Sequence, residues 1–208
     1  MSLVLDFIRG GGVMMYPLVI CSIALIGIIL ERIITLRKAS VDGEELLDTI
    51  KQNYKPGSGA SATAAIQAIE PIKAPLARIF VRGLKNAHRD ADAMEMAIEQ
   101  EAASEMPVYE AYLPVLKTIV NIGPLLGLLG TIAGMISSFR AASSQGLSNP
   151  TQILGGISEA LISTATGITI AVLGFIFYNY FTNVAKKAGE DIEFYGAELV
   201  NYLTGRID

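Results

Sequence analysis

The stretch Gly123-Pro-Leu-Leu-Gly-Leu-Leu-Gly-Thr-Ile-Ala-Gly-Met-Ile-Ser-Ser-Phe139 lies inside a segment, residues 118–139, that contains no charged residue. About 20 apolar residues are enough for a helix to cross a bilayer, so this segment predicts a membrane span. Its glycines, at positions 123, 127, 130 and 134, recur at helical spacing and leave one face of the helix nearly bare. Thr131 lies on that face. The pattern is typical of a helix that packs closely in a bundle and lines a narrow ion path.

Two further stretches, residues 10–30 and 160–185, are also free of charge. The first begins too late and runs too long for a cleaved signal peptide. We therefore expect an all-α membrane protein with three transmembrane helices rather than a soluble protein with three buried helices. The helices are expected over residues 13–37, 115–140 and 156–185. They would be joined by outer segments 1–12 and 141–155, and extended by cytoplasmic helical regions 38–114 and 186–208.

The basic residues are distributed unevenly among the connecting segments. Of the 16 Lys and Arg residues, Arg9 and Arg140 alone lie outside the ranges 32–117 and 186–206. The positive-inside rule then places the N-terminus outside and the C-terminus in the cytoplasm. Prolines at 107, 114 and 124 predict that a helix running from the cytoplasmic region into the second span is kinked.

The second and third spans carry small residues at three- and four-residue spacing. Such faces let helices approach closely in lipid, where packing rather than the hydrophobic effect drives association. The candidate packing residues are Gly127, Gly130 and Gly134 in the second span, and Gly167 and Gly174 in the third.

Thr131 and Thr164 are the candidate polar groups of an ion path. Thr131 precedes Phe139 by eight residues and Thr164 follows Ala160 by four, which is about 12 Å and about 6 Å from the outer ends of their helices. We expect the two hydroxyls at comparable depth, as one polar layer if the helices share a cavity. The alternative is that each hydroxyl bonds the carbonyl four residues back in its own helix.

Charged residues stand at the ends of the spans. Glu159, at the outer end of the third span, is either an interfacial group in water or a cation-attracting group at a pore mouth. Glu31 and Arg32 end the first span and form a candidate ion pair at the inner interface. For Arg32 the alternative is snorkelling into the headgroup region.

No ionisable residue lies deep within a span, although proton relays usually need one. A second protein would therefore have to supply it. One cysteine, Cys21, and one histidine, His88, are too few for the usual structural zinc sites. We find no phosphate-loop motif and no nucleophilic triad, and the net charge of −4 argues against nucleic-acid binding. We expect no cofactor, no metal and no enzyme activity.

The quoted stretch resembles the second-span signature of the TolQ/ExbB/MotA proton-channel family. Gly156-Ile-Ser-Glu-Ala-Leu-Ile-Ser-Thr-Ala-Thr-Gly167 resembles the start of the family's third span, and Glu31-Arg32 resembles its Glu-Arg pair. The layout is closer to ExbB and TolQ than to MotA, which has four spans. The resemblance covers most of the chain, although residues 39–90 contribute little to it.

The resemblance implies a homopentameric ring around an apolar pore in the bacterial inner membrane, with the outer segments in the periplasm. The pore would hold the single transmembrane helices of two ExbD/TolR-like partners, which would supply the missing aspartate. Thr131 and Thr164 match the pore threonines of the family, and Glu159 matches its third-span glutamate. A TonB/TolA-like protein is a possible further partner.

Three functions remain open at this point. The first is a proton-driven motor subunit that powers work in the periplasm or at the outer membrane. The second is a structural membrane scaffold, in which the small-residue faces only assemble helices. The third is a sodium-driven homologue. The sequence does not indicate which process is energised.

Overall fold

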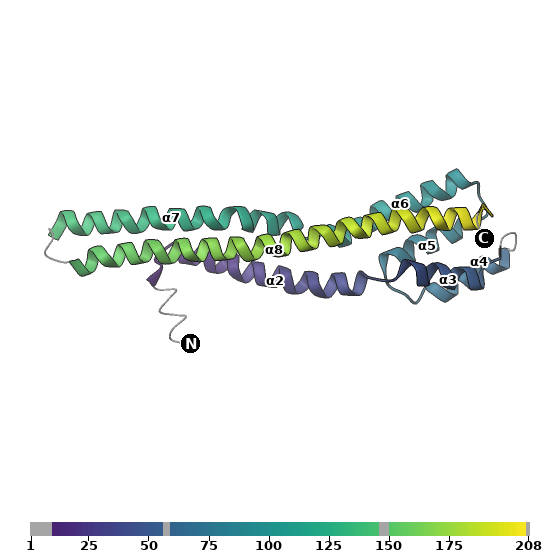
Figure 1. Cartoon of the computed structure of the whole chain (residues 1–208), viewed down its shortest axis with the longest axis horizontal. Helices are drawn as coiled ribbons and strands as arrows, with labels where there is room; N and C mark the ends of the chain where they lie inside the picture. Colours follow the sequence, from purple (N-terminus) through teal and green to yellow (C-terminus); the bar gives the residue numbers. More distant parts are fainter. Residues whose placement is uncertain (1–9, 56–58, 146–149, 207–208) are drawn as a thin grey trace. The chain divides into compact units, whose positions relative to one another are not determined.

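The computed structural model describes residues 10–55, 59–145 and 150–206, and within these ranges the regular elements are all α-helices (Figure 1). The helices are α2 (Met15–Ala39), α3 (Gly43–Asn53), α4 (Gly59–Ile69), α5 (Pro75–Lys85), α6 (Ala91–Glu110), α7 (Leu113–Gln145) and α8 (Pro150–Leu203).

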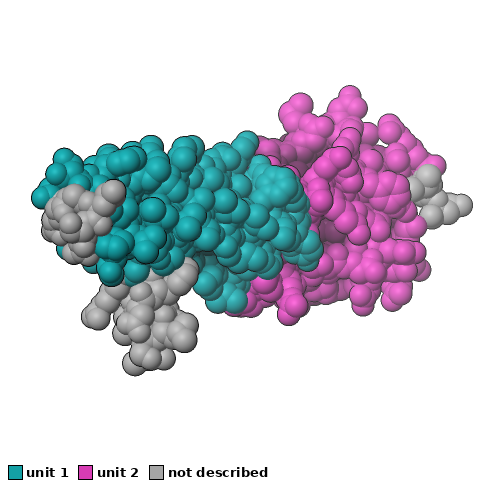
Figure 2. All heavy atoms as spheres, turned by 60° about the vertical axis from the view of Figure 1, so that its left-hand side comes forward, with its two compact units in different colours: residues 1–31, 112–180 teal, residues 32–111, 181–208 magenta. Residues whose placement is uncertain are grey.

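The chain forms two compact units (Figure 2). Unit 1 comprises Met1–Glu31 and Tyr112–Tyr180, and unit 2 comprises Arg32–Ala111 and Phe181–Asp208. Both α2 and α8 contribute residues to the two units, so each of these long helices has one end in each core.

Unit 1 contains the apolar parts of α2, α7 and α8. Three helical segments of the described chain, Met15–Asn53, Ala91–Ser144 and Pro150–Leu203, each include a stretch long and apolar enough to cross a membrane. Large apolar side chains such as Leu125 and Ile168 are exposed on these helices in the single chain. The prediction of an all-α protein with three membrane-spanning helices is confirmed.

The helices α7 and α8 run side by side in opposite directions, and glycines lie where they meet (Figure 1). A Cβ placed on Gly123 would be 3.0 Å from the carbonyl oxygen of Gly167, and one on Gly134 would be 2.5 Å from that of Gly156. A side chain at Gly134 would force the two backbones apart, and one at Gly123 would make a tight contact, because backbone atoms cannot move aside as a flexible side chain can.

The expected kink before the second span is a complete break in the helix. Helix α6 ends at Glu110, and Tyr112 has a φ of 61°, which is outside the helical region. Pro114 then lies in the first turn of α7, where a missing N–H is tolerated. Pro107 lies inside α6 and Pro124 inside α7.

Helix α8 continues without interruption through the boundary expected near residue 185. The charge pattern predicts a span over residues 156–185 and a separate helical region over residues 186–208. Lys186-Lys187 changes the polarity of the helix there, but neither residue interrupts a helical backbone, because lysine is a good helix former.

Unit 2 is built from α3 to α6 and the end of α8. Helix α3 begins at an N-cap, Asp42, whose carboxylate accepts the N–H of Glu44 at 3.0 Å, and α6 begins at Asp90, which accepts the N–H of Ala93 at 3.3 Å. The core of the unit is apolar, and its most deeply buried side chains include Leu46, Ile50, Ile69, Ile79, Phe80, Leu84, Met94 and Leu199.

Candidate functional site

The candidate site lies in unit 1, where α7 and α8 approach each other through their backbones. A Cβ on Gly127 would be 3.1 Å from both the carbonyl oxygen of Ser163 and the Cα of Thr164. A Cβ on Gly130 would overlap the Ser163 hydroxyl, and one on Gly167 would overlap the carbonyl of Gly123. The absence of side chains at these glycines therefore lets polar groups of one helix reach the backbone of the other.

The close contact between the helices lets the Thr164 side chain reach the backbone of α7. Its hydroxyl donates a hydrogen bond of 3.1 Å to the carbonyl oxygen of Gly127, across the interface between α8 and α7. In an α-helix the same carbonyl accepts the N–H of the residue four positions later, which here is Thr131. The side chain of Thr164 and the backbone of Thr131 thus converge on the Gly127 carbonyl.

The Thr131 hydroxyl does not contact Thr164 directly. It donates to the carbonyl of Leu128 in its own helix at 2.7 Å, and Thr131 is half-buried. The Thr164 hydroxyl donates to Gly127, so the two hydroxyls bind carbonyls of consecutive residues of α7, about 1.5 Å apart along the helix axis. The two hydroxyls therefore lie at a similar depth along α7, although they do not bond each other.

Three other hydroxyls of the third span bond carbonyls within α8. Thr166 donates to Ile162 and Thr169 to Ala165, each at 2.8 Å. Ser163 is fully buried and donates to backbone carbonyls of its own helix. This is the ordinary behaviour of a membrane hydroxyl, and the bond from Thr164 to another helix departs from it.

Glu159 lies on a different side of α8 from Thr164. Its carboxylate packs directly on Gly12, in the turn that precedes α2, where φ is +68° and a side chain would overlap the carboxylate. Five residues separate Glu159 from Thr164, which is about 140° around the helix. The structure therefore groups Glu159 with the N-terminal turn and not with the threonines.

Ser138 is a polar group of α7 that is not among the predicted site residues. It is 6% exposed, and its hydroxyl donates to the carbonyl of Ile153 in α8 at 2.9 Å as well as to Gly134. A second hydroxyl thus connects α7 and α8 near the outer end of the pair. The sequence signal that could have found it was its position four residues after Gly134, on the same small-residue face.

Gly174 is packed between two helices. A Cβ there would be 2.8 Å from a methyl carbon of Val120 in α7 and 3.3 Å from one of Leu25 in α2. Gly174 therefore permits close contact among the three apolar helices of unit 1. The other candidate glycines lie at the contact between α7 and α8.

Arg32 is buried rather than snorkelling, with 2% of the residue exposed. Its guanidinium donates to the carbonyl oxygen of Val108 at 2.9 Å. Val108 lies in the last turn of α6, where carbonyls lack helical N–H partners and the helix dipole favours a positive charge. Arg32 therefore caps α6 within unit 2. Glu31, its neighbour in sequence, is half-buried and belongs to unit 1.

No cluster suited to a metal ion is present in the described part of the chain, since no three His, Cys, Asp or Glu side chains come together there. The site described above consists of hydroxyls, backbone carbonyls and glycine contacts. Such groups can hydrogen-bond water or a carboxylic acid, but they carry no titratable proton of their own.

Comparison with known proteins agrees with the resemblance seen in the sequence. The profile of the MotA/TolQ/ExbB proton channel family matches residues 71–193. The chain is 30% identical over 176 residues to the biopolymer transport protein ExbB-like 3 of Synechocystis sp., covering 84% of this chain and 82% of that protein. Thr131, Thr164 and Glu159 lie within the matched range, whereas Glu31 and Arg32 precede it.

Two further relatives extend the comparison. An ExbB homologue of Methanothermobacter thermautotrophicus is 32% identical over 193 residues, which is 91% of this chain and 67% of that protein. The Tol-Pal system protein TolQ of Pseudomonas aeruginosa is 38% identical over 92 residues, or 44% of this chain and 38% of that protein. The similarity to the ExbB-like proteins therefore extends over most of this chain.

Proposed function

Because the chain belongs to the MotA/TolQ/ExbB proton channel family, we propose that it is the channel-forming subunit of a complex that uses the proton motive force to drive work in the periplasm or at the outer membrane. In this proposal it is a multi-pass protein of the bacterial inner membrane. Its N-terminus and the outer ends of α7 and α8 face the periplasm. Unit 2 and the C-terminus lie in the cytoplasm.

The observation that carries the proposal is the hydrogen bond from Thr164 to the Gly127 carbonyl. The hydroxyl protons of Thr164 and Thr131 are both donated to backbone carbonyls, so each hydroxyl has lone pairs left to accept another hydrogen bond. Such an acceptor can bind water or a protonated carboxylic acid, but it offers no proton to a carboxylate. The pair therefore favours the neutral form of an acid that carries a proton through lipid.

The acid itself comes from a partner in this proposal. Residues 118–139 and 160–185 contain no Asp or Glu, and a proton path at membrane depth needs a titratable group. We assign this role to an aspartate in the single transmembrane helix of an ExbD/TolR-like protein. Five copies of the chain would surround two such helices, and a TonB/TolA-like protein would receive the force.

The test removes the Thr164 hydroxyl without changing its shape. In the complex purified with its partner and reconstituted into vesicles, Thr164→Val should lower proton flux about two- to twelvefold, the range for one net hydrogen bond of about 0.5–1.5 kcal/mol. Thr164→Ser, which keeps the hydroxyl, should retain most of the flux. Thr169→Val is the matched control, because that hydroxyl bonds only Ala165 in its own helix. Normal flux in Thr164→Val would refute the assignment of Thr164.

Two alternatives make different predictions in the same preparation. A structural scaffold would show no flux in any variant, and no protein with a membrane aspartate would copurify with it. A sodium-driven complex would show flux that depends on sodium when protons are held constant. The glycine contacts between α7 and α8 are compatible with all three functions, so the flux measurement distinguishes among them.

A further inference from the structure

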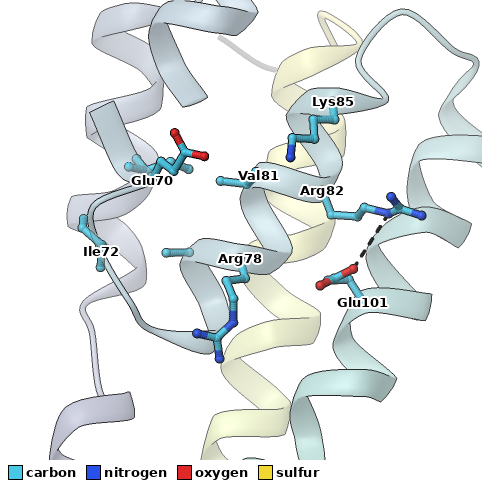
Figure 3. A pocket seen from close by; sticks show the side chains of 9 residues that line it. Glu70, Ile72, Arg78, Val81, Arg82, Lys85 and Glu101 are labelled. Carbon is cyan, nitrogen blue, oxygen red and sulfur yellow. Dashed lines mark ion pairs between the residues drawn. The ribbon is translucent and has the colours of Figure 1, made fainter. Parts of the chain in front are cut away.

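Unit 2 contains a half-open pocket of about 440 Å³ bordered by α4, α5 and α6 (Figure 3). One side of α5 supplies three cationic side chains, and Ile72 and Val81 add apolar surface. Glu70 and Glu101 lie on the facing walls. The volume is in the range of ordinary ligand sites, but the pocket opens to the surface. The three cations are Arg78, Arg82 and Lys85.

The charges of the pocket, with Glu105 included, balance in number but are not all paired, since Glu70 has no ion pair among the described residues. Arg78 is held by Glu105, with two hydrogen bonds of 2.6 and 2.5 Å. Arg82 has a looser partner, since its Nε is 3.9 Å from Glu101, and both side chains are partly exposed. Lys85 has no ion pair among the described residues. The Lys85 end of the pocket is therefore the part that can accept a carboxylate from outside.

The outer face of α6 has the complementary chemistry. Asp92, Glu95 and Glu99 are exposed there, and within the described chain none of them has a basic partner. Met96 lies among them and is 69% exposed, somewhat more than Ile34 and Phe194 in the same unit. Because Glu99 is two residues from Glu101, their side chains point about 160° apart around the helix. The acidic face is therefore turned away from the pocket of its own copy.

We propose that the outer face of α6 of one copy binds the pocket of the adjacent copy. The acidic residues would pair with Arg82 and Lys85, and Met96 would contact Ile72 and Val81, since methionine adapts well to a partly apolar surface. The two surfaces are different and lie on different sides of one copy, so the contact is head-to-tail and repeats until a ring closes. This inference rests on the proposed homo-oligomer and identifies its contact in unit 2.

Disulfide cross-linking between separate copies tests the contact. The chain has one cysteine, so Cys21→Ser provides a background without thiols. One tagged copy carries Val81→Cys and a second, differently tagged copy carries Met96→Cys, so any disulfide between the new cysteines joins two copies. Oxidation of membranes containing both full-length chains should give a dimer with both tags. The matched control pairs Met96→Cys with Lys55→Cys, an exposed position outside the pocket, and should give none.

Charge exchange distinguishes a specific contact from random collision. In this background Lys85→Glu or Glu99→Lys should each lower the yield of dimer about two- to fivefold, as expected for partly exposed ion pairs. The two changes on facing copies should restore the yield. Raising the ionic strength from about 0.1 M to about 1 M should also lower it, because the screening length falls from about 10 Å to about 3 Å.

Two results would overturn the inference. One is the absence of a mixed dimer while the copies still copurify, which would place the contact elsewhere. The other is a mixed dimer whose yield changes neither with the charge substitutions nor with the salt concentration. Neither result bears on proton flux, so the proposal for Thr164 can stand if this one fails. Conversely, normal flux in Thr164→Val with intact cross-linking would refute only the proton path.

Discussion

Single glycines set the distance between α7 and α8. At Gly134 the atoms nearest to an added Cβ would be backbone atoms, the carbonyl oxygen of Gly156 at 2.5 Å and the nitrogen of Ala160 at 2.9 Å. At Gly27, which is also in an apolar helix, no atom lies within 4 Å of such a carbon. The same residue type therefore has different roles at the two positions, and only Gly134 is required for the helix pair in one copy.

Substitution of these glycines by alanine should have unequal effects. Gly134→Ala should destabilise unit 1 by about 1–3 kcal/mol, the usual cost of overpacking, because two backbones must separate. Gly27→Ala should leave stability unchanged or slightly raised, since alanine is the better helix former. Thermal unfolding followed by circular dichroism in detergent measures both. Equal melting temperatures for the two variants would contradict the close contact at Gly134.

At the scale of elements, α6 is fixed at its end by groups from α2. Arg32 caps the carbonyl of Val108 at 2.9 Å. Tyr109, in the same turn of α6, donates its hydroxyl to the carbonyl of Ala39 at 3.4 Å and is 5% exposed. Burial, with a smaller contribution from Glu105, raises the pKa of Tyr109 to about 12 from 10.0. The phenol is therefore neutral in the folded unit well into the alkaline range.

The raised pKa of Tyr109 predicts a loss of stability at alkaline pH. The folded pKa exceeds the unfolded one, so this contribution is complete below pH 10 and disappears as the pH rises towards about 12. Melting temperatures measured between pH 9 and about 12 should fall more steeply for the wild type than for Tyr109→Phe. Tyr54, whose pKa burial also raises, should leave a residual decline in the variant. Parallel curves for the two proteins would contradict the assignment.

At the scale of the whole molecule, the distribution of basic residues predicts the orientation in the membrane. Fourteen of the 16 lie in the ranges 32–117 and 186–206, which places unit 2 in the cytoplasm by the positive-inside rule. The exposed Ser143, near the end of α7, would then face the periplasm. A cysteine placed at an exposed position on either side of the membrane can therefore show which compartment that position faces.

Labelling of single cysteines tests this orientation. In the Cys21→Ser background, a membrane-impermeant maleimide should react with Ser143→Cys in spheroplasts, whereas Lys55→Cys should react only after the membrane is permeabilised. Both positions are exposed in the structure, so a lack of reaction reports the membrane barrier and not burial. The reverse pattern would invert the assigned orientation and the direction of the proposed proton path.

Much of the fold could be predicted because its signals are local. Three charge-free stretches indicate three helices, and Asp90 followed by an apolar pattern indicates the start of α6. The boundaries near Ala111 and residue 185 were less predictable. A single residue with φ of 61° ends one helix, while Lys186-Lys187 does not interrupt another. Backbone conformation at one residue depends on packing that the local sequence does not contain.

The candidate site was predictable in its residues but not in its contacts. The spacing and polarity of the sequence indicate Thr131, Thr164 and the glycines. They do not indicate the bond from Thr164 to Gly127 or the packing of Glu159 on Gly12. Ser138 was overlooked because a serine near the end of a span looks like an ordinary surface group.

The sequence by itself determined that the chain is helical, has three spans and belongs to a proton-channel family. Those properties follow from the cost of placing charge in lipid and from motifs within single helices. Only the tertiary structure decided which hydroxyl bonds a carbonyl of another helix and which side of α8 carries Glu159. It also decided that Arg32 is buried and caps the end of α6. The reason is that the register between helices depends on the fit of backbones separated by many residues, and no local pattern specifies it.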